Sequence, residues 1–155
     1  MKAIPILAMT ALAISCAQAQ SKVNVFSGKD VMSQLAALTQ AAKAPGSSGA
    51  TLGDYGADAI KLSVRTASGG AEIHAHYGDI FVITEGKATL ITGGTVVSAH
   101  TGKDGETKGS SIENGESNMI VKGDVVHIPA GVPHQLMLAP GDVYSAIVIK
   151  VKELP

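Results

Sequence analysis

Residues 123–134 read GDVVHIPAGVPH, which has the form G-x-x-x-x-x-P-x-G-x-x-H. The apolar residues at 125–128 predict a short strand, and the two prolines and the glycine that follow predict a rigid turn. Such a turn fixes the direction of the chain just before the next predicted strand, at 135–138. We therefore expect His134, the last residue of the turn, to be aimed at a defined point.

A second group of polar residues lies upstream, in EIHAHYGD at 72–79. Alternate residues of a strand share one face and have Cα atoms about 7 Å apart, which suits two imidazoles that bind one ion. A strand at 72–76 would put His74 and His76 on one face, and Glu72 shares that face. A third histidine for such an ion would have to come from another strand, and the rigid turn before His134 is suited to aim it inward.

Period-two alternation dominates the second part of the chain. It predicts strands at 60–64, 72–76, 80–84, 88–92, 96–99, 125–128, 135–138 and 144–151. The Glu85-Gly86 pair is expected to be a turn, and 46–55 and 101–109 are expected to be loops. The second loop carries Lys103, Asp104, Glu106 and Lys108, which we expect to be solvated. Short strands without intervening helices favour an all-β sandwich or barrel.

One helix is predicted before the strands, at 28–43. Ser27 and Asp30 have the spacing of a capping box, and Val31, Leu35, Leu38 and Ala42 form one apolar stripe. The stripe must be buried, so the helix is expected to pack on the outside of the sheet or at a subunit contact.

The composition excludes several classes of protein. The 155 residues are 45% hydrophobic, and 12 basic against 13 acidic residues give a formal charge of −1. This length serves one domain, and the balance of charge argues against a disordered chain and a nucleic-acid partner. No phosphate loop or nucleotide fingerprint is present.

The N-terminus is predicted to direct export. Lys2, an apolar run from Ile4 to Ile14 and Ala17-Gln18-Ala19 have the order of a signal peptide cleaved before Gln20. The run is too short for a membrane span, which needs about 20 apolar residues. The mature protein is then periplasmic or extracellular. The alternative is a lipoprotein anchored through Cys16, because residues 13–16 loosely resemble a lipobox.

Together, the stretches at 72–86 and 123–134 resemble the two motifs of the cupin superfamily, and the resemblance extends over 69–138. It implies a double-stranded β-helix (jelly-roll) barrel, which the N-terminal helix predicted at 28–43 precedes. Cupins of this size often pair through sheet edges, which protects those edges, so the resemblance also predicts a homodimer. The chain would divide into a signal peptide (1–19), an N-terminal segment (20–57) and a barrel domain (58–155). The resemblance also implies that the paired histidines, an acidic residue and His134 bind one divalent metal.

The sequence departs from the first cupin motif near the acidic position. Only Tyr77 and Gly78 separate His76 from the acid, and the acid is Asp79 where a glutamate is usual. Asp79, Glu72 or water therefore remain alternatives for the oxygen ligand. Glu72, His127 and Tyr77 are possible pocket residues, whereas His100 is expected to be solvated.

A site of this kind leaves positions on the ion open for a ligand. Imidazoles suit Fe(II), Mn(II), Ni(II), Cu(II) or Zn(II), and the ligand types do not choose among them. The main hypothesis is a metal-dependent enzyme that acts on a small oxygenated molecule, by oxygenation or by isomerase or lyase chemistry through an enolate. A non-catalytic periplasmic module that binds a small ligand or a metal is the alternative, and a barrel without metal is the third hypothesis.

Overall fold

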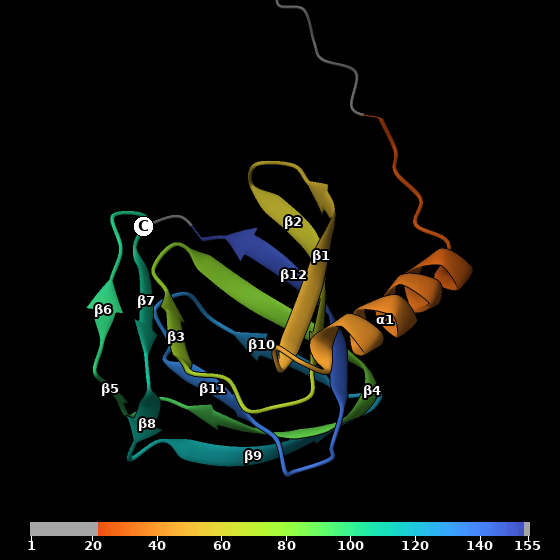
Figure 1. The fold of residues 1–155 in the computed structure, drawn as a ribbon. Helices are drawn as coiled ribbons and strands as arrows, with labels where there is room; N and C mark the ends of the chain where they lie inside the picture. Colours follow the sequence, from red (N-terminus) through yellow and green to blue (C-terminus); the bar gives the residue numbers. More distant parts are fainter. Residues whose placement is uncertain (1–21, 154–155) are drawn as a thin grey trace, which may run out of the picture.

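The computed structural model of the protein describes residues 22–153, which form one helix and twelve strands (Figure 1). The predicted signal peptide, its cleavage site and Cys16 lie outside the described residues. In chain order the elements are α1 (Gly28–Ala42), β1 (Ser47–Asp54), β2 (Asp58–Arg65), β3 (Ala71–His74), β4 (Tyr77–Thr92), β5 (Thr95–Val97), β6 (His100–Thr101), β7 (Glu106–Gly109), β8 (Ser111–Glu113), β9 (Glu116–Val121), β10 (Val125–Ile128), β11 (His134–Met137) and β12 (Tyr144–Lys152).

The helix α1 forms where the capping box predicts it. The Ser27 hydroxyl oxygen accepts a hydrogen bond from the Asp30 backbone N–H at 3.1 Å, which satisfies one exposed donor of the first turn. Val31 and Leu35 are buried against Leu62 and Val64 of β2, so α1 packs on the outer face of the barrel (Figure 1). No helix within residues 22–153 is long and apolar enough to cross a membrane.

The strands pair antiparallel throughout and curl into a barrel (Figure 1). The largest sheet has the order β1-β2-β12-β4-β11-β3-β7-β6, and β9 and β10 also pair with β4. The first half of β4 pairs with β10 and β12, and the second half pairs with β9 and β11. The 16-residue strand β4 therefore connects the two walls of the barrel.

The prediction of a turn at Glu85-Gly86 is wrong, because β4 continues through both residues. Gly86 has a φ of 75°, and the register with β12 shifts between Ser145 and Ala146. A bulge of this kind bends a strand without ending it. A Cβ at Gly86 would overlap the carbonyl oxygen of Val143, so only glycine fits where the strand bends.

Two segments predicted as loops also contain strands. Residues 47–54 form β1, which hydrogen-bonds along β2 although the segment is rich in glycine and serine. Within 101–109, Glu106–Gly109 form β7, which pairs with β3 and places Glu106 opposite His74. Tertiary pairing outweighs weak strand propensity in both cases. The second correction bears directly on the site described below.

The barrel interior is apolar over most of its length. Side chains of β4, β9, β10, β11 and β12 form one buried cluster: Phe81, Ile83, Ala88, Leu90, Ile120, Ile128, Leu136, Tyr144, Ala146 and Val148. On β12 the buried residues Tyr144, Ala146 and Val148 follow at alternate positions, and Lys150 continues the series. The apolar core therefore gives way to charged groups at the Lys150 end, where the cavity described below lies.

The Gly86 bulge can be tested with a matched pair of glycine variants. Gly86 and Gly93 both have positive φ, but nothing lies within 4 Å of a Cβ at Gly93. We expect Gly93→Ala to lower the free energy of unfolding by about 1–2 kcal/mol, the cost of a left-handed residue. Gly86→Ala must also move the β12 backbone and is expected to cost about 3 kcal/mol or more. Equal midpoints in urea denaturation would contradict this account of the bend.

Candidate metal centre

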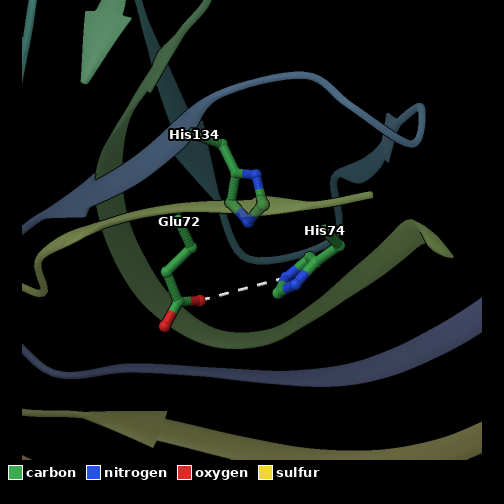
Figure 2. A group of neighbouring side chains, drawn as sticks. All are labelled: Glu72, His74 and His134. Atoms are coloured by element: carbon green, nitrogen blue, oxygen red, sulfur yellow. Dashed lines mark ion pairs between the residues drawn. The ribbon is translucent and has the colours of Figure 1, made fainter. Parts of the chain in front are cut away.

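Three side chains from two strands converge in the barrel. Glu72 and His74 lie two residues apart on β3, and His134 begins β11, which pairs with β3 at Glu72. One potential ligand atom from each of the three lies within 4.8 Å of the others. Figure 2 shows the two imidazole rings and the Glu72 carboxylate pointing toward a common space. The residues therefore form a candidate metal centre.

Each imidazole has its Nδ1 atom engaged away from this space. His74 Nδ1 is hydrogen-bonded to the Glu106 carboxylate, and His134 Nδ1 lies 3.1 Å from the carbonyl oxygen of Val132. Because these partners are acceptors, each Nδ1 carries the proton and donates it. The Nε2 atoms then face the centre. A second hydrogen bond that fixes the tautomer in this way is typical of histidines that bind metals.

Asp79 brings a second carboxylate to the centre. Its Oδ2 atom lies 3.3 Å from His74 Nε2 and 3.8 Å from His134 Nε2, and its side chain is 4% exposed. Its other oxygen, Oδ1, accepts a hydrogen bond from Lys150 Nζ at 2.7 Å. Asp79 and Lys150 are register partners on β4 and β12, so both side chains point inward. One Asp79 oxygen thus faces the imidazoles, and the other is held by an ammonium group.

The charges around the centre shift the pKa of each of its buried groups. Burial alone would lower the pKa of His74, but hydrogen bonds to Asp79 and Glu106 outweigh it and raise the pKa. Burial opposes ionisation of Asp79, yet the hydrogen bonds from His74 and Lys150 lower its pKa. Burial lowers the pKa of His134. His134 is therefore neutral at neutral pH, which is the form that binds a metal.

The turn that follows β10 is attached to the strand that carries His74. Gly131 has a φ of 78°, and its N–H donates to the carbonyl oxygen of His74 at 2.9 Å. This bond fixes the distance between β3 and the Pro129–Pro133 turn. The turn therefore positions both His134 and the carbonyl group of Val132. The second motif thus supplies one ligand and the group that orients it.

Comparison of the fold with solved structures agrees with this architecture. No protein-family model and no curated protein matches the sequence. Among solved structures, a Schizosaccharomyces pombe Cnp3 cupin domain is similar, with a TM-score of 0.52 and 13% identity over 69% of this chain and 65% of that chain. A predicted oxalate decarboxylase from Thermotoga maritima has a TM-score of 0.51 and 14% identity over 69% of this chain and 81% of that chain. The chain has the cupin fold.

A third similar structure is the DMSP lyase DddQ from Ruegeria pomeroyi. It has a TM-score of 0.50 and 17% identity over 70% of this chain and 48% of that chain. The chain therefore spans about half of the lyase and just under two thirds of the Cnp3 domain. At these identities the comparison establishes the fold, and the chemistry of this chain has to come from its own residues.

The cupin barrel does not bring His76 to the centre. Strand β3 ends at His74, and Ala75 and His76 form a bend that leads into β4, with the Ala75 N–H donating to Gly105. His76 is exposed. The expectation that His74 and His76 share one strand face is wrong, because the strand stops one residue too early for alternation to apply. Glu72, two residues before His74, is on the strand and faces the centre.

The other two possible pocket residues lie elsewhere. His127 is exposed on β10, where Val126 and Ile128 pack into the interior, and it lines a separate hollow. Alternation places it with the 67%-exposed Val125 on the outer face. Tyr77 is half-buried and lines a neighbouring hollow that shares Lys61 and Lys150 with the metal centre's cavity.

Sequence reasoning missed two groups that contact the candidate ligands. Glu106 was expected in a solvated loop, but its place opposite His74 in the β3–β7 ladder brings its carboxylate to the imidazole. Lys150 lies near the end of the largely apolar strand β12. Its place two residues after Val148 is the one sequence feature that indicates an inward-facing side chain. Neither contact can be found from the sequence without the strand register.

The candidate centre opens onto a cavity of about 220 Å³. Its lining combines the candidate ligands with three basic side chains and apolar groups; it comprises Lys61, Leu62, Ser63, Arg65, Gly70, Glu72, His74, Asp79, Phe81, His134, Gln135, Leu136, Val148 and Lys150. This volume is below the range of about 300–1,000 Å³ that holds drug-sized ligands. The cavity fits a small molecule beside the metal centre.

The Asp79–Lys150 pair can be tested by a double-mutant cycle on protein freed of metal with a chelator. The two side chains are only 4% and 19% exposed. Lys150→Met leaves the buried Asp79 carboxylate with His74 as its remaining partner and without its ammonium group, so we expect the free energy of unfolding to fall by about 3 kcal/mol. Adding Asp79→Asn should restore most of the loss. The exposed pair of Lys87 and Asp142 provides the control, and Lys87→Met should cost less than about 1 kcal/mol. Additive losses in the double variant would show that the pair is not coupled.

Proposed function

We propose that this cupin is a metal-dependent enzyme that acts on a small oxygenated organic molecule. One observation carries the proposal: the Nε2 atoms of His74 and His134 face one space beside two carboxylates, while both Nδ1 atoms are held by acceptors. Two buried imidazoles whose Nε2 atoms converge beside carboxylates are suited to a shared cation, which would replace the proton on His74 Nε2.

The residues fit a divalent transition metal. His74, His134 and Glu72 would supply two nitrogens and one oxygen, and Asp79 Oδ2 is the nearest further donor. Two histidines and one carboxylate on one side of an ion are typical of non-haem Fe(II) oxygenases, and Mn(II), Ni(II), Cu(II) and Zn(II) also accept these ligands. This differs from the expected three-histidine set, because Glu72 is at the centre and His76 is not.

A bound divalent metal supplies a Lewis acid with open positions for an oxygen atom of the substrate, for water or for dioxygen. The residues around the centre orient the ligands, limit water and place charge. Glu106 and the Val132 carbonyl hold the two imidazoles in place, so little reorganisation is needed during reaction. Phe81, Leu136 and Val148 provide an apolar lining that limits water in the cavity. Lys150 keeps Asp79 ionised next to the reacting region.

Two reaction classes are consistent with this site. One is oxygenation, and the other is isomerase or lyase chemistry through an enolate. The names of two similar structures, a predicted oxalate decarboxylase and a DMSP lyase, support chemistry on small organic acids for cupins of this shape. We place oxygenation first, because two histidines and one carboxylate form the ligand set typical of non-haem Fe(II) oxygenases.

A non-catalytic binding module is the second candidate function. The observation that favours it is the ion pair of Asp79 with Lys150, which ties one oxygen of the second carboxylate to an ammonium group. A site held in this way can retain a metal and a small ligand without turnover. Export and a homodimer both stay predictions under either function.

Metal binding is tested with four histidine-to-alanine variants, two at the candidate centre and two outside it. After anaerobic reconstitution and desalting, we expect elemental analysis to find about one divalent ion per wild-type chain. His74→Ala and His134→Ala should lose it, because each removes an Nε2 ligand. His76→Ala and His127→Ala should keep it, because both residues are exposed outside the centre. Wild-type metal content in His134→Ala, or loss in His76→Ala, would refute this ligand set.

Catalysis is tested separately from metal retention. The metal-reconstituted protein is incubated with a panel of small hydroxy and keto compounds, and dioxygen and the compounds are followed by an oxygen electrode and by NMR. We expect metal-dependent consumption of at least one compound, with loss of turnover in His134→Ala. Dioxygen uptake would identify an oxygenase, and turnover without it an isomerase or lyase. A compound that binds and is recovered unchanged would favour the binding module.

A further inference from the structure

The wall opposite the candidate metal centre is basic. Lys61, Ser63 and Arg65 lie at alternate positions of β2 and all line the cavity. Leu62 and Val64 between them are buried in the cluster with α1, although Leu62 also forms part of the lining. Register agrees with this placement, because Lys61 and Arg65 pair with the inward-facing Val148 and Tyr144 of β12. One face of β2 thus carries two cations into the cavity, and the other face forms part of the core.

Neither of these cations forms an ion pair with a carboxylate of the described residues. The ion pairs formed within residues 22–153 include Lys150 but neither Lys61 nor Arg65. In that part of the chain, Arg65 Nε is also one of two buried side-chain polar atoms without a hydrogen-bond partner. The other is the hydroxyl of Tyr144, the register partner of Arg65. A buried donor without an acceptor is costly, so a bound group that accepts hydrogen bonds would be stabilised here.

The Arg65 guanidinium packs against the backbone of Gly69. A Cβ at Gly69 would lie 2.7 Å from Arg65 Cζ, so a larger residue there would displace the end of the Arg65 side chain. Gly69 hydrogen-bonds to β11: its N–H donates to Leu136 at 2.9 Å, and its carbonyl accepts from Gln135 Nε2 at 2.8 Å. The guanidinium therefore packs on a residue that is bonded to the strand that begins with His134.

The charges in and around the cavity balance only while no metal is bound. Lys61, Arg65 and Lys150 line the cavity with Glu72 and Asp79. Glu106, behind His74, adds a third carboxylate, so the site is neutral when the histidines are neutral. A divalent ion at the proposed centre would leave two positive charges in excess. In a partly apolar cavity, such an excess favours an anionic ligand.

We propose that Arg65, with Lys61, binds the carboxylate of the substrate, and that the substrate is a small organic acid whose second oxygen reaches the metal centre. This deepens the proposed function, on which the role of the second oxygen depends. The planar guanidinium matches a carboxylate with two parallel hydrogen bonds. The cavity of about 220 Å³ limits the acid to a small one. Phosphate and sulfate are the competing anions, and the experiment separates them from carboxylates.

The probes are glycolate and malonate, with glycolamide as the uncharged analogue and with phosphate and sulfate as tetrahedral anions. Binding to the full mature chain is measured by titration calorimetry, with and without reconstituted metal. We expect both carboxylates to bind and glycolamide to bind at least about tenfold more weakly. Phosphate or sulfate binding as tightly as the carboxylates would overturn the assignment of the ligand class.

Variants locate the binding group. Arg65→Gln is expected to weaken carboxylate binding by about 10- to 100-fold, the effect of losing a charged hydrogen-bond donor. Lys103→Gln changes the net charge equally at an exposed site and should leave binding unchanged. Gly69→Ala keeps the Arg65 cation but displaces its guanidinium from the backbone of residue 69. This variant should weaken carboxylate binding while the protein stays folded. Unchanged carboxylate affinity in Arg65→Gln would refute the proposal.

The metal content of the same samples separates this inference from the proposed function. Carboxylate binding that depends on Arg65 in a protein that retains no metal would support the anion site and refute the metal-dependent function. A protein that retains metal, and whose carboxylate affinity is the same in Arg65→Gln and wild type, would leave the metal centre intact and refute the anion site.

Discussion

The candidate centre depends on one constraint: two imidazoles must present Nε2 to the same point, and each needs an acceptor behind it. For His74 the acceptor is Glu106, which reaches the ring only because β7 pairs with β3 in a register that sets the two residues opposite each other. For His134 it is the Val132 carbonyl, held by a turn that is tied to the His74 backbone through Gly131. Both orienting groups are thus fixed by the same strand, β3.

The candidate centre also places carboxylates inside an apolar barrel, and their partners decide how each can act. A carboxylate as buried as Asp79 is unfavourable alone, and Lys150 stabilises it from the neighbouring strand. The pairing has a cost for the chemistry, because an oxygen that accepts from an ammonium is a poorer ligand and a weaker base. Glu72 has no such close partner, since its nearest cation, Lys108 Nζ, is 4.0 Å away and largely exposed. Glu72 is therefore the better oxygen ligand, even though Asp79 occupies the acidic position of the family motif.

The sequence predicted the fold and the second motif well, for reasons that are local. A capping box and an apolar stripe are sufficient to predict α1, and a proline-bounded turn is sufficient to place His134 at the start of β11. The first motif failed at His76, because alternation holds only while the strand lasts, and β3 ends at His74. The end of that strand is set by where the loop after β6 can pair, through the bond from Ala75 to Gly105. No pattern within residues 72–79 contains that information.

The groups that sequence reasoning overlooked share a physical feature: each is a charged residue in a segment with an ordinary local pattern. Arg65 and Lys61 fall at the polar positions of an alternating strand, which usually face water. Here α1 covers the apolar face of β2, so the polar face is turned into the barrel. The same helix that was predicted from its cap thus determines that β2 presents cations to the cavity. In a barrel without that helix, Leu62 and Val64 would be expected to face inward, and the wall opposite the histidines would be apolar.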